Sequence, residues 1–129
     1  MPRLIRSPKF WLACFLLWFG VLWLLSSFSF VGKIAPPIPN FDKLGHFGYF
    51  FGGGGLLSAY LFRRKPDHPN WKAIIGGVIF ATALTGCLDE YHQTFTPGRS
   101  GNDPYDLLAD VLGAAAGAFT FKKIHHRLK

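Results

Sequence analysis

The sequence predicts an all-α membrane protein in which four transmembrane helices pack as an antiparallel bundle, forming one domain over residues 1–129. Three observations lead to this fold class. The run from Phe10 to Val31 carries no charge, and about 20 apolar residues are enough to cross a bilayer. Only 16% of the residues are charged, against roughly 25% in an average soluble domain. The basic residues fall in short clusters between apolar runs, which is typical of membrane proteins.

The first helix is expected over about residues 10–31. A cleaved signal peptide is the alternative interpretation, but its apolar core spans only about 7–15 residues. The longer run therefore favours a membrane span that stays in the protein. The connection that follows contains Pro36, Pro37 and Pro39, and proline in this density excludes a helix there.

The other three helices are expected over about residues 43–62, 71–92 and 104–121. Four consecutive glycines, Gly52 to Gly55, lie in the first of these. Each would destabilise a soluble helix by about 1 kcal/mol relative to alanine, whereas in a membrane glycines let two helix backbones approach closely. The glycine run thus favours the bilayer over a soluble four-helix bundle. That bundle is the rival interpretation because the charge-free parts of helices two and three are short.

Capping and turn signals mark several helix ends. Asp42 is predicted to be the N-cap of the second helix. Asp103 followed by Pro104 is a favourable start for the fourth, since aspartate suits the N-cap and proline the first helical position. The Pro97-Gly98 pair predicts a turn between the third and fourth helices.

The charge distribution predicts the orientation. The net charge is +7, but the fourteen Lys and Arg residues form no single patch, so nucleic acid is not an expected partner. Three of them, Lys33, Lys43 and Arg99, belong to one side of the predicted bundle, and the other eleven belong to the opposite side. Positive loops stay in the cytoplasm, so both termini are expected there. The expected partner is the lipid bilayer, and a homo-oligomer is left open.

Ionisable side chains are predicted to converge at the outer end of the bundle. At 100° per residue, the polar residues of each helix share a face with small residues, and small faces pack helix against helix. The polar side chains should therefore point inward, where ionisable residues of a membrane bundle indicate a functional site by default. The predicted cluster consists of His46, Glu90, Gln93, Asp106 and Asp110, with Arg99 within reach from the loop.

Each of these residues also has an ordinary structural interpretation. Asp42 and Asp103 suit helix caps, and Asp106 suits the positive end of a helix dipole. Glu90 lies near a helix C-terminus, where a carboxylate opposes the dipole and needs a partner. Arg99 is the expected partner, in a pair that is either structural or functional.

The residues from Asp42 to Gly117 resemble the VanZ-like family of bacterial membrane proteins. The matching motifs are Asp42-Lys43-x-x-His46 with Tyr49-Phe50, Glu90-x-x-Gln93-x-Phe95-x-Pro97-Gly98-Arg99, and Asp106-x-x-x-Asp110-x-x-Gly113-x-x-x-Gly117. The family takes its name from a protein linked to low-level resistance to the glycopeptide antibiotic teicoplanin. The resemblance implies a multi-pass protein of the bacterial plasma membrane and cell envelope. It supplies no reaction.

Three functions fit this site. In the first, the protein binds or modifies a lipid-linked, peptidoglycan-related or other anionic envelope ligand, with His46 and Glu90 as catalytic acid and base. The residues expected to contact the ligand are Asp42, Lys43, Gln93, Arg99, Asp106 and Asp110. In the second, the cluster is a structural ion-pair network and the protein is not an enzyme. The third, a proton pathway through Glu90 and Asp110, is disfavoured because the cytoplasmic halves of helices two to four carry no acidic residue.

No metal or other cofactor is predicted from the sequence. Histidine and carboxylates at the predicted cluster are suitable ligands for a metal ion, but the sequence contains no HxxxH or HExxH motif. A nucleophile is also lacking, since Ser100 is the nearest serine and has no evident base beside it.

Overall fold

The computed structural model describes residues 2–27, 40–98 and 103–128, and the described residues contain helices and no strands. The helices are α1 (Arg3–Arg6), α2 (Pro8–Ser26), α4 (Phe41–Arg64), α5 (Trp71–Gln93), α6 (Pro104–Ile124) and the short 3₁₀ helix η1 (His125–Leu128). The all-helical fold is therefore confirmed. The end of the first helix, expected near residue 31, lies outside the described residues.

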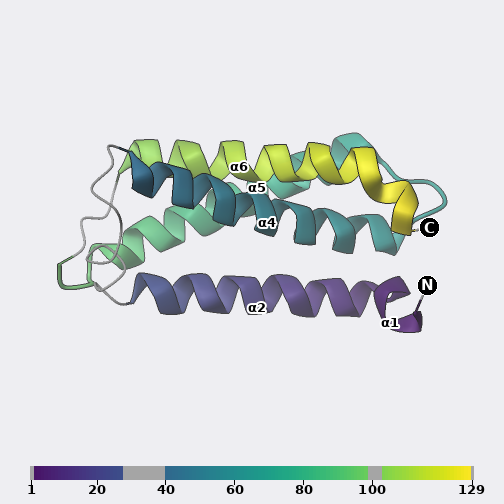
Figure 1. Ribbon diagram of the computed structural model, residues 1–129, viewed down its shortest axis with the longest axis horizontal. Helices are drawn as coiled ribbons and strands as arrows, with labels where there is room; N and C mark the ends of the chain where they lie inside the picture. Colours follow the sequence, from purple (N-terminus) through teal and green to yellow (C-terminus); the bar gives the residue numbers. More distant parts are fainter. Residues whose placement is uncertain (1, 28–39, 99–102, 129) are drawn as a thin grey trace.

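The four long helices run side by side, with successive ones antiparallel (Figure 1). Both ends of the chain lie at one end of the bundle, which we call the terminal end. Helices α4 and α6 begin, and α2 and α5 finish, at the opposite end, which we call the polar end. Helices α4 and α6 form the most extensive pair, and α2 packs against α4 and α5.

Glycines allow the closest helix contacts. A Cβ atom added to Gly113 or Gly117 would collide with the backbone carbonyl of Phe47 or Phe51 on α4. A Cβ on Gly54 would likewise collide with the backbone of Ala114 on α6. The backbones of α4 and α6 therefore touch directly, as the small-residue faces predict.

Helix α2 is joined to α4 by a different contact. The ring of Trp18 fills the space beside Gly53, where a Cβ atom would overlap it. Trp18 Nε1 donates to the carbonyl of Tyr49 at 3.0 Å, and the Tyr49 hydroxyl donates back to the carbonyl of Trp18 at 2.6 Å. Tyr49 thus contacts α2 and does not enter the polar cluster.

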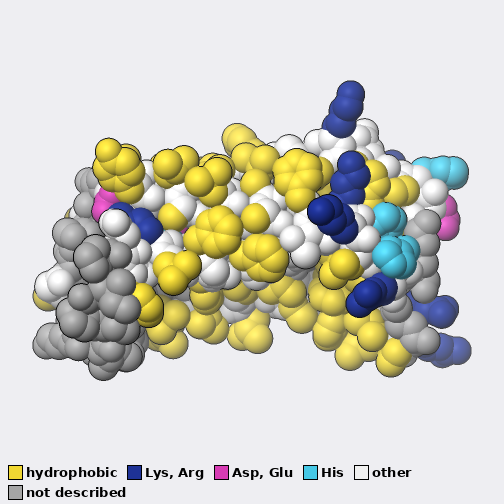
Figure 2. Space-filling view, turned by 45° about the horizontal axis from the view of Figure 1, so that its top comes forward, with side chains coloured by type: hydrophobic (Ala, Val, Ile, Leu, Met, Phe, Trp, Pro, Cys, Tyr) yellow, Lys and Arg dark blue, Asp and Glu magenta, His cyan; other side chains and the backbone are white. Residues whose placement is uncertain are grey.

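Two of the described helices, α2 and α5, are long and apolar enough to cross a membrane. Large apolar side chains such as Leu17 and Phe80 are 70% and 73% exposed, while Asp89 and Asp110 are buried. Figure 2 shows hydrophobic side chains over the middle of the molecule, with many Lys, Arg and His side chains at the terminal end. The bundle is therefore polar in parts of its interior and apolar over much of its surface.

The helix starts agree with the predictions in one case and differ in another. Asp103 is the N-cap of α6, its Oδ1 accepting from the Tyr105 N–H at 2.9 Å. The expected cap at Asp42 is wrong: α4 begins one residue earlier, and Asn40 is its N-cap with a φ of 61°. Asparagine is one of the few residues that adopts this left-handed conformation readily, so the chain turns there and Asp42 falls in the first turn.

Candidate functional site: a charged cluster at the polar end

Lys43 is the centre of one group of charges. Its Nζ atom lies 2.8 Å from Asp42 Oδ2, 2.8 Å from Asp103 Oδ2 and 3.1 Å from Asp106 Oδ1. The adjacent ammonium of Lys43 lowers the pKa of the Asp103 carboxyl, which precedes the first residue of α6. These ion pairs join the start of α4 to the start of α6, and we call the four residues the lysine group.

His46 lies one turn further along α4 and faces α6. Its Nδ1 atom is 2.7 Å from Asp110 Oδ1, and its Nε2 atom is 3.7 Å from Asp106 Oδ2. Asp110 is fully buried, and the His46 side chain is 15% exposed. The imidazole thus sits between two carboxylates one helical turn apart, which fixes the orientation of its ring.

Glu90 reaches the same region from α5. Its Oε2 atom accepts the backbone N–H of Asp103 at 3.2 Å, which supplies the partner that a carboxylate near a helix C-terminus needs. Its Oε1 atom has no hydrogen-bond partner among the described residues. One potential ligand atom from each of His46, Glu90 and Asp110 lies within 4.8 Å of the others. We call these three residues the histidine group.

A third polar group joins α2 to the C-terminal end of α5. Asp89 accepts hydrogen bonds from the Ser26 hydroxyl and, at 2.8 Å, from the side-chain amide of Gln93. The Thr96 hydroxyl donates to the carbonyl of Ser26 at 2.8 Å. Asp89 and Gln93 are both buried, so this group fixes the C-terminal end of α2 against α5.

The structure brings together most of the residues in the predicted cluster. His46, Glu90, Asp106 and Asp110 converge from three helices, Asp42 and Lys43 lie beside them, and Gln93 turns instead to Asp89. Arg99, the expected partner of Glu90, lies outside the described residues. The catalytic or binding roles of all these residues stay predictions.

Sequence reasoning missed Asp89 because it chose the wrong face for much of α5. The small residues of this helix were expected to face the bundle, but Gly76 is exposed, and the buried residues there include Val78, Thr82 and Thr85. The hydroxyls of Thr82 and Thr85 donate to carbonyls of their own helix, so these residues are compatible with burial. Thr82, Thr85 and Asp89 follow one another at helical spacing, and this pattern could have predicted the buried face of α5.

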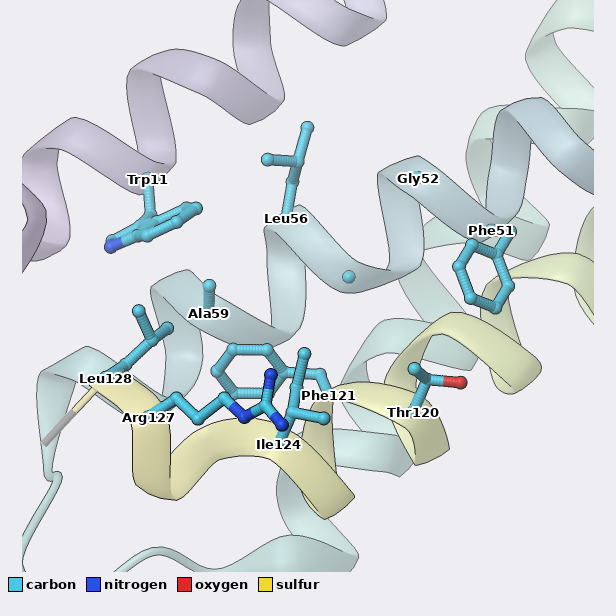
Figure 3. A pocket seen from close by; sticks show the side chains of 11 residues that line it. Trp11, Phe51, Gly52, Leu56, Ala59, Thr120, Phe121, Ile124, Arg127 and Leu128 are labelled. Atoms are coloured by element: carbon cyan, nitrogen blue, oxygen red, sulfur yellow. The ribbon is translucent and has the colours of Figure 1, made fainter.

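The terminal end of the bundle contains a pocket of a different character. It has a volume of about 360 Å³ and is lined mostly by apolar side chains, including Trp11, Leu56 and Phe121, together with Arg127 (Figure 3). None of the charged residues described above lines it. The pocket at the terminal end and the charged cluster at the polar end are therefore separate features.

These features define a helical bundle with two helices of membrane-spanning length and composition and a charged cluster at one end. The chain belongs to the VanZ/LLP1 family, whose model matches residues 7–125. The match includes all of α2, which the motifs from Asp42 to Gly117 did not cover. No curated protein and no solved structure matches the chain.

Proposed function

We propose that this VanZ-like protein is a multi-pass protein of the bacterial plasma membrane, with four spans and both termini in the cytoplasm. Exposure of the apolar helices supports this: only 11% of the most apolar window of α2 and 28% of that of α5 are buried. A core helix of a soluble protein would be mostly buried. The basic side chains at the terminal end support a cytoplasmic position for that end (Figure 2).

The polar end then faces outward, and we propose that it binds a polar lipid-linked or peptidoglycan-related ligand of the cell envelope. The observation that carries this proposal is the convergence of His46, Glu90, Asp106 and Asp110 from three helices. Burying ionisable groups in a membrane bundle is unfavourable and is typically retained for function. His46 and Glu90 are the side chains proposed to exchange protons with a bound ligand.

The remaining site residues are proposed to form the rest of the ligand-binding site, by contacting the ligand or by supporting the residues that do. Lys43 and Arg99 carry positive charge suited to a phosphate or carboxylate. The other proposed contacts are Asp42, Gln93, Asp106 and Asp110. Family membership also motivates the proposed link to teicoplanin resistance.

Teicoplanin susceptibility tests this function. The parent chain, expressed in a sensitive bacterium, should raise the inhibitory concentration of teicoplanin. The variants His46→Gln and Glu90→Gln should lose this effect while reaching the membrane in equal amounts. Asp67→Asn, at an exposed acidic residue of the terminal end, is the matched control and should behave as the parent. Equal protection by all variants would eliminate a chemical role for the cluster.

A structural network is the second candidate function, and the three ion pairs of Lys43 favour it. Under this alternative, neutral substitutions in the cluster reduce the amount of folded protein in proportion to the loss of protection. Measuring both quantities for each variant separates the candidates. A ligand site predicts loss of protection by protein that is still folded.

A further inference from the structure

We propose that the histidine group, His46, Glu90 and Asp110, is a binding site for one divalent transition-metal cation. The three side chains come from α4, α5 and α6, and one potential ligand atom from each lies within 4.8 Å of the others. Imidazole and carboxylate are the ligand types that Zn²⁺ and Mn²⁺ accept in proteins. This inference goes beyond ligand recognition and does not depend on the identity of the envelope ligand. With the cation bound, His46 and Glu90 hold it and do not themselves exchange protons with the ligand.

The lysine group differs from the histidine group because a cationic side chain already lies among its carboxylates. Its three carboxylates, from Asp42, Asp103 and Asp106, surround the Lys43 ammonium at 2.8 to 3.1 Å. The potential ligand atoms of these three carboxylates also lie within 4.8 Å of one another. Lys43 therefore takes the place that a metal ion would need, which leaves the histidine group as the candidate.

Glu90 and Asp110 each carry a buried carboxylate oxygen that the described residues leave unpaired. Glu90 is 4% exposed and Asp110 is fully buried. Neither Glu90 Oε1 nor Asp110 Oδ2 has a hydrogen-bond partner among the described residues. An unpaired buried carboxylate oxygen is strongly unfavourable, and a divalent cation would satisfy both atoms and balance both charges.

The ligand set points to a particular class of cation. Ca²⁺ prefers six to eight oxygen ligands, and Mg²⁺ prefers an octahedron of oxygens with several waters. One imidazole and two carboxylates suit Mn²⁺ and Zn²⁺ better. Three protein ligands also leave coordination positions open, as in catalytic metal sites. An envelope ligand with an oxygen donor would fit such a position.

The fold holds the three residues on rigid elements. A Cβ atom on Gly86 of α5 would lie 2.8 Å from Asp110 Oδ2 and 2.9 Å from a methyl carbon of Leu107. The absence of a side chain at Gly86 thus lets the Asp110 carboxylate approach α5 and Glu90. Sites held on packed helices keep their geometry better than sites on loops.

Titration of the purified, metal-stripped protein with Mn²⁺ in detergent tests the proposal. Electron paramagnetic resonance should show one bound Mn²⁺ per chain, and Zn²⁺ should displace it. Pulsed measurements on the bound Mn²⁺ should detect the nitrogen of a coordinated imidazole, and His46→Gln should remove that signal. Glu90→Gln and Asp110→Asn should weaken Mn²⁺ binding about tenfold or more.

The matched control is Asp67→Asn, an exposed carboxylate far from the site, which should bind Mn²⁺ like the parent. Asp42→Asn, in the lysine group, should also leave binding nearly unchanged. Absence of stoichiometric Mn²⁺ or Zn²⁺ binding by the folded parent would overturn the proposal. So would a nitrogen signal that survives His46→Gln. Metal binding by the parent can be measured even where a variant fails to fold. Because the measurement involves no antibiotic, a failure of the metal-site proposal can be distinguished from a failure of the proposed function.

Discussion

His46 Nδ1 lies 2.7 Å from Asp110 Oδ1, and this contact connects α4 to α6 in the interior of the bundle. It lies between the lysine group on one side and the close backbone contact at Gly113 on the other. The electrostatic pair and the glycine contact therefore act on the same helix interface, and substitutions can separate their contributions.

Asp110→Ala should destabilise the metal-free protein by about 3 kcal/mol or more, because the substitution leaves His46 buried without its partner. Asp110→Asn should be milder, since an amide oxygen still accepts a hydrogen bond. Thermal unfolding in detergent with EDTA measures both effects. Asp67→Ala is the exposed control and should change stability by no more than about 0.5 kcal/mol.

A double-mutant cycle with His46→Ala measures the pair directly. Residues that share a buried hydrogen bond typically show coupling of about 0.5–3 kcal/mol. Additive effects of the two substitutions would contradict the contact as described.

Asp103 provides a pH-dependent contribution with a defined sign. The Lys43 ammonium lowers the pKa of Asp103 below its usual value of 3.8. The folded state therefore releases this proton more readily than the unfolded state, and the carboxylate stabilises the fold above about pH 4. The stabilisation should be lost as the pH falls through the lowered pKa. Unfolding temperatures measured from pH 7 to pH 2 should show this loss.

Lys43→Met removes the largest cause of that shift. The acid-induced fall in the unfolding temperature should be smaller in this variant than in the parent, because only the backbone N–H groups that Asp103 caps then still lower its pKa in the folded state. If the unfolding temperatures of the two proteins fell equally between pH 7 and pH 2, the role of Lys43 would be contradicted.

The helices and the convergence of charges were predictable from sequence because both depend on patterns along a single helix. The uncharged run from Phe10, the Asp103-Pro104 start and the spacing of Asp106 and Asp110 each carry a local physical signal. The face of α5 was harder to predict. Small residues such as Gly76 pack helices only where a neighbour is present, and a Cβ atom added to Gly76 would meet no described atom within 4 Å. Whether a neighbouring helix covers a small residue depends on how the helices pack, which sequence spacing does not encode.

The start of α4 shows a second limit. Asp42 and Asn40 are both good N-cap residues by type. Asn40 is the cap, with a left-handed backbone, and Asp42 lies in the first turn. A shift of two residues is within the usual uncertainty of helix ends, and here it leaves the Asp42 carboxylate to pair with Lys43 instead of capping the helix.

Gly113→Ala should destabilise the bundle although alanine is the better helix former. The added Cβ would collide with the carbonyl of Phe47, so α4 and α6 would have to separate and lose their close packing. Gly48→Ala is the matched control, since a Cβ there has nothing within 4 Å. The control should be neutral or stabilising by up to about 1 kcal/mol. Relative to the parent, the unfolding temperature should fall in Gly113→Ala and should stay the same or rise in Gly48→Ala.

Ser26→Ala should loosen the C-terminal end of α2, at the polar end of the bundle. Asp89 would lose the hydroxyl donor from Ser26 and keep the amide of Gln93. Losing one hydrogen bond to a buried carboxylate should destabilise the protein by about 1–3 kcal/mol. Hydrogen exchange in detergent should show faster exchange at the end of α2 than in the parent. Ser27→Ala, at the exposed neighbour, should leave that exchange unchanged.

Cysteine accessibility tests the orientation of the bundle. In a background with Cys14 and Cys87 replaced by serine, Pro97→Cys introduces a thiol into the exposed turn after α5, at the polar end. Asp67→Cys introduces one into the exposed loop between α4 and α5, at the terminal end. A membrane-impermeant maleimide added to intact cells should label the first and leave the second unlabelled until the membrane is permeabilised. The positive charges near the terminal end are the physical reason for this expectation, since loops rich in Lys and Arg favour the cytoplasmic side. Labelling in the reverse order would place the charged cluster on the cytoplasmic side and rule out an outer-face ligand site, while labelling of both in intact cells would contradict the four-span arrangement.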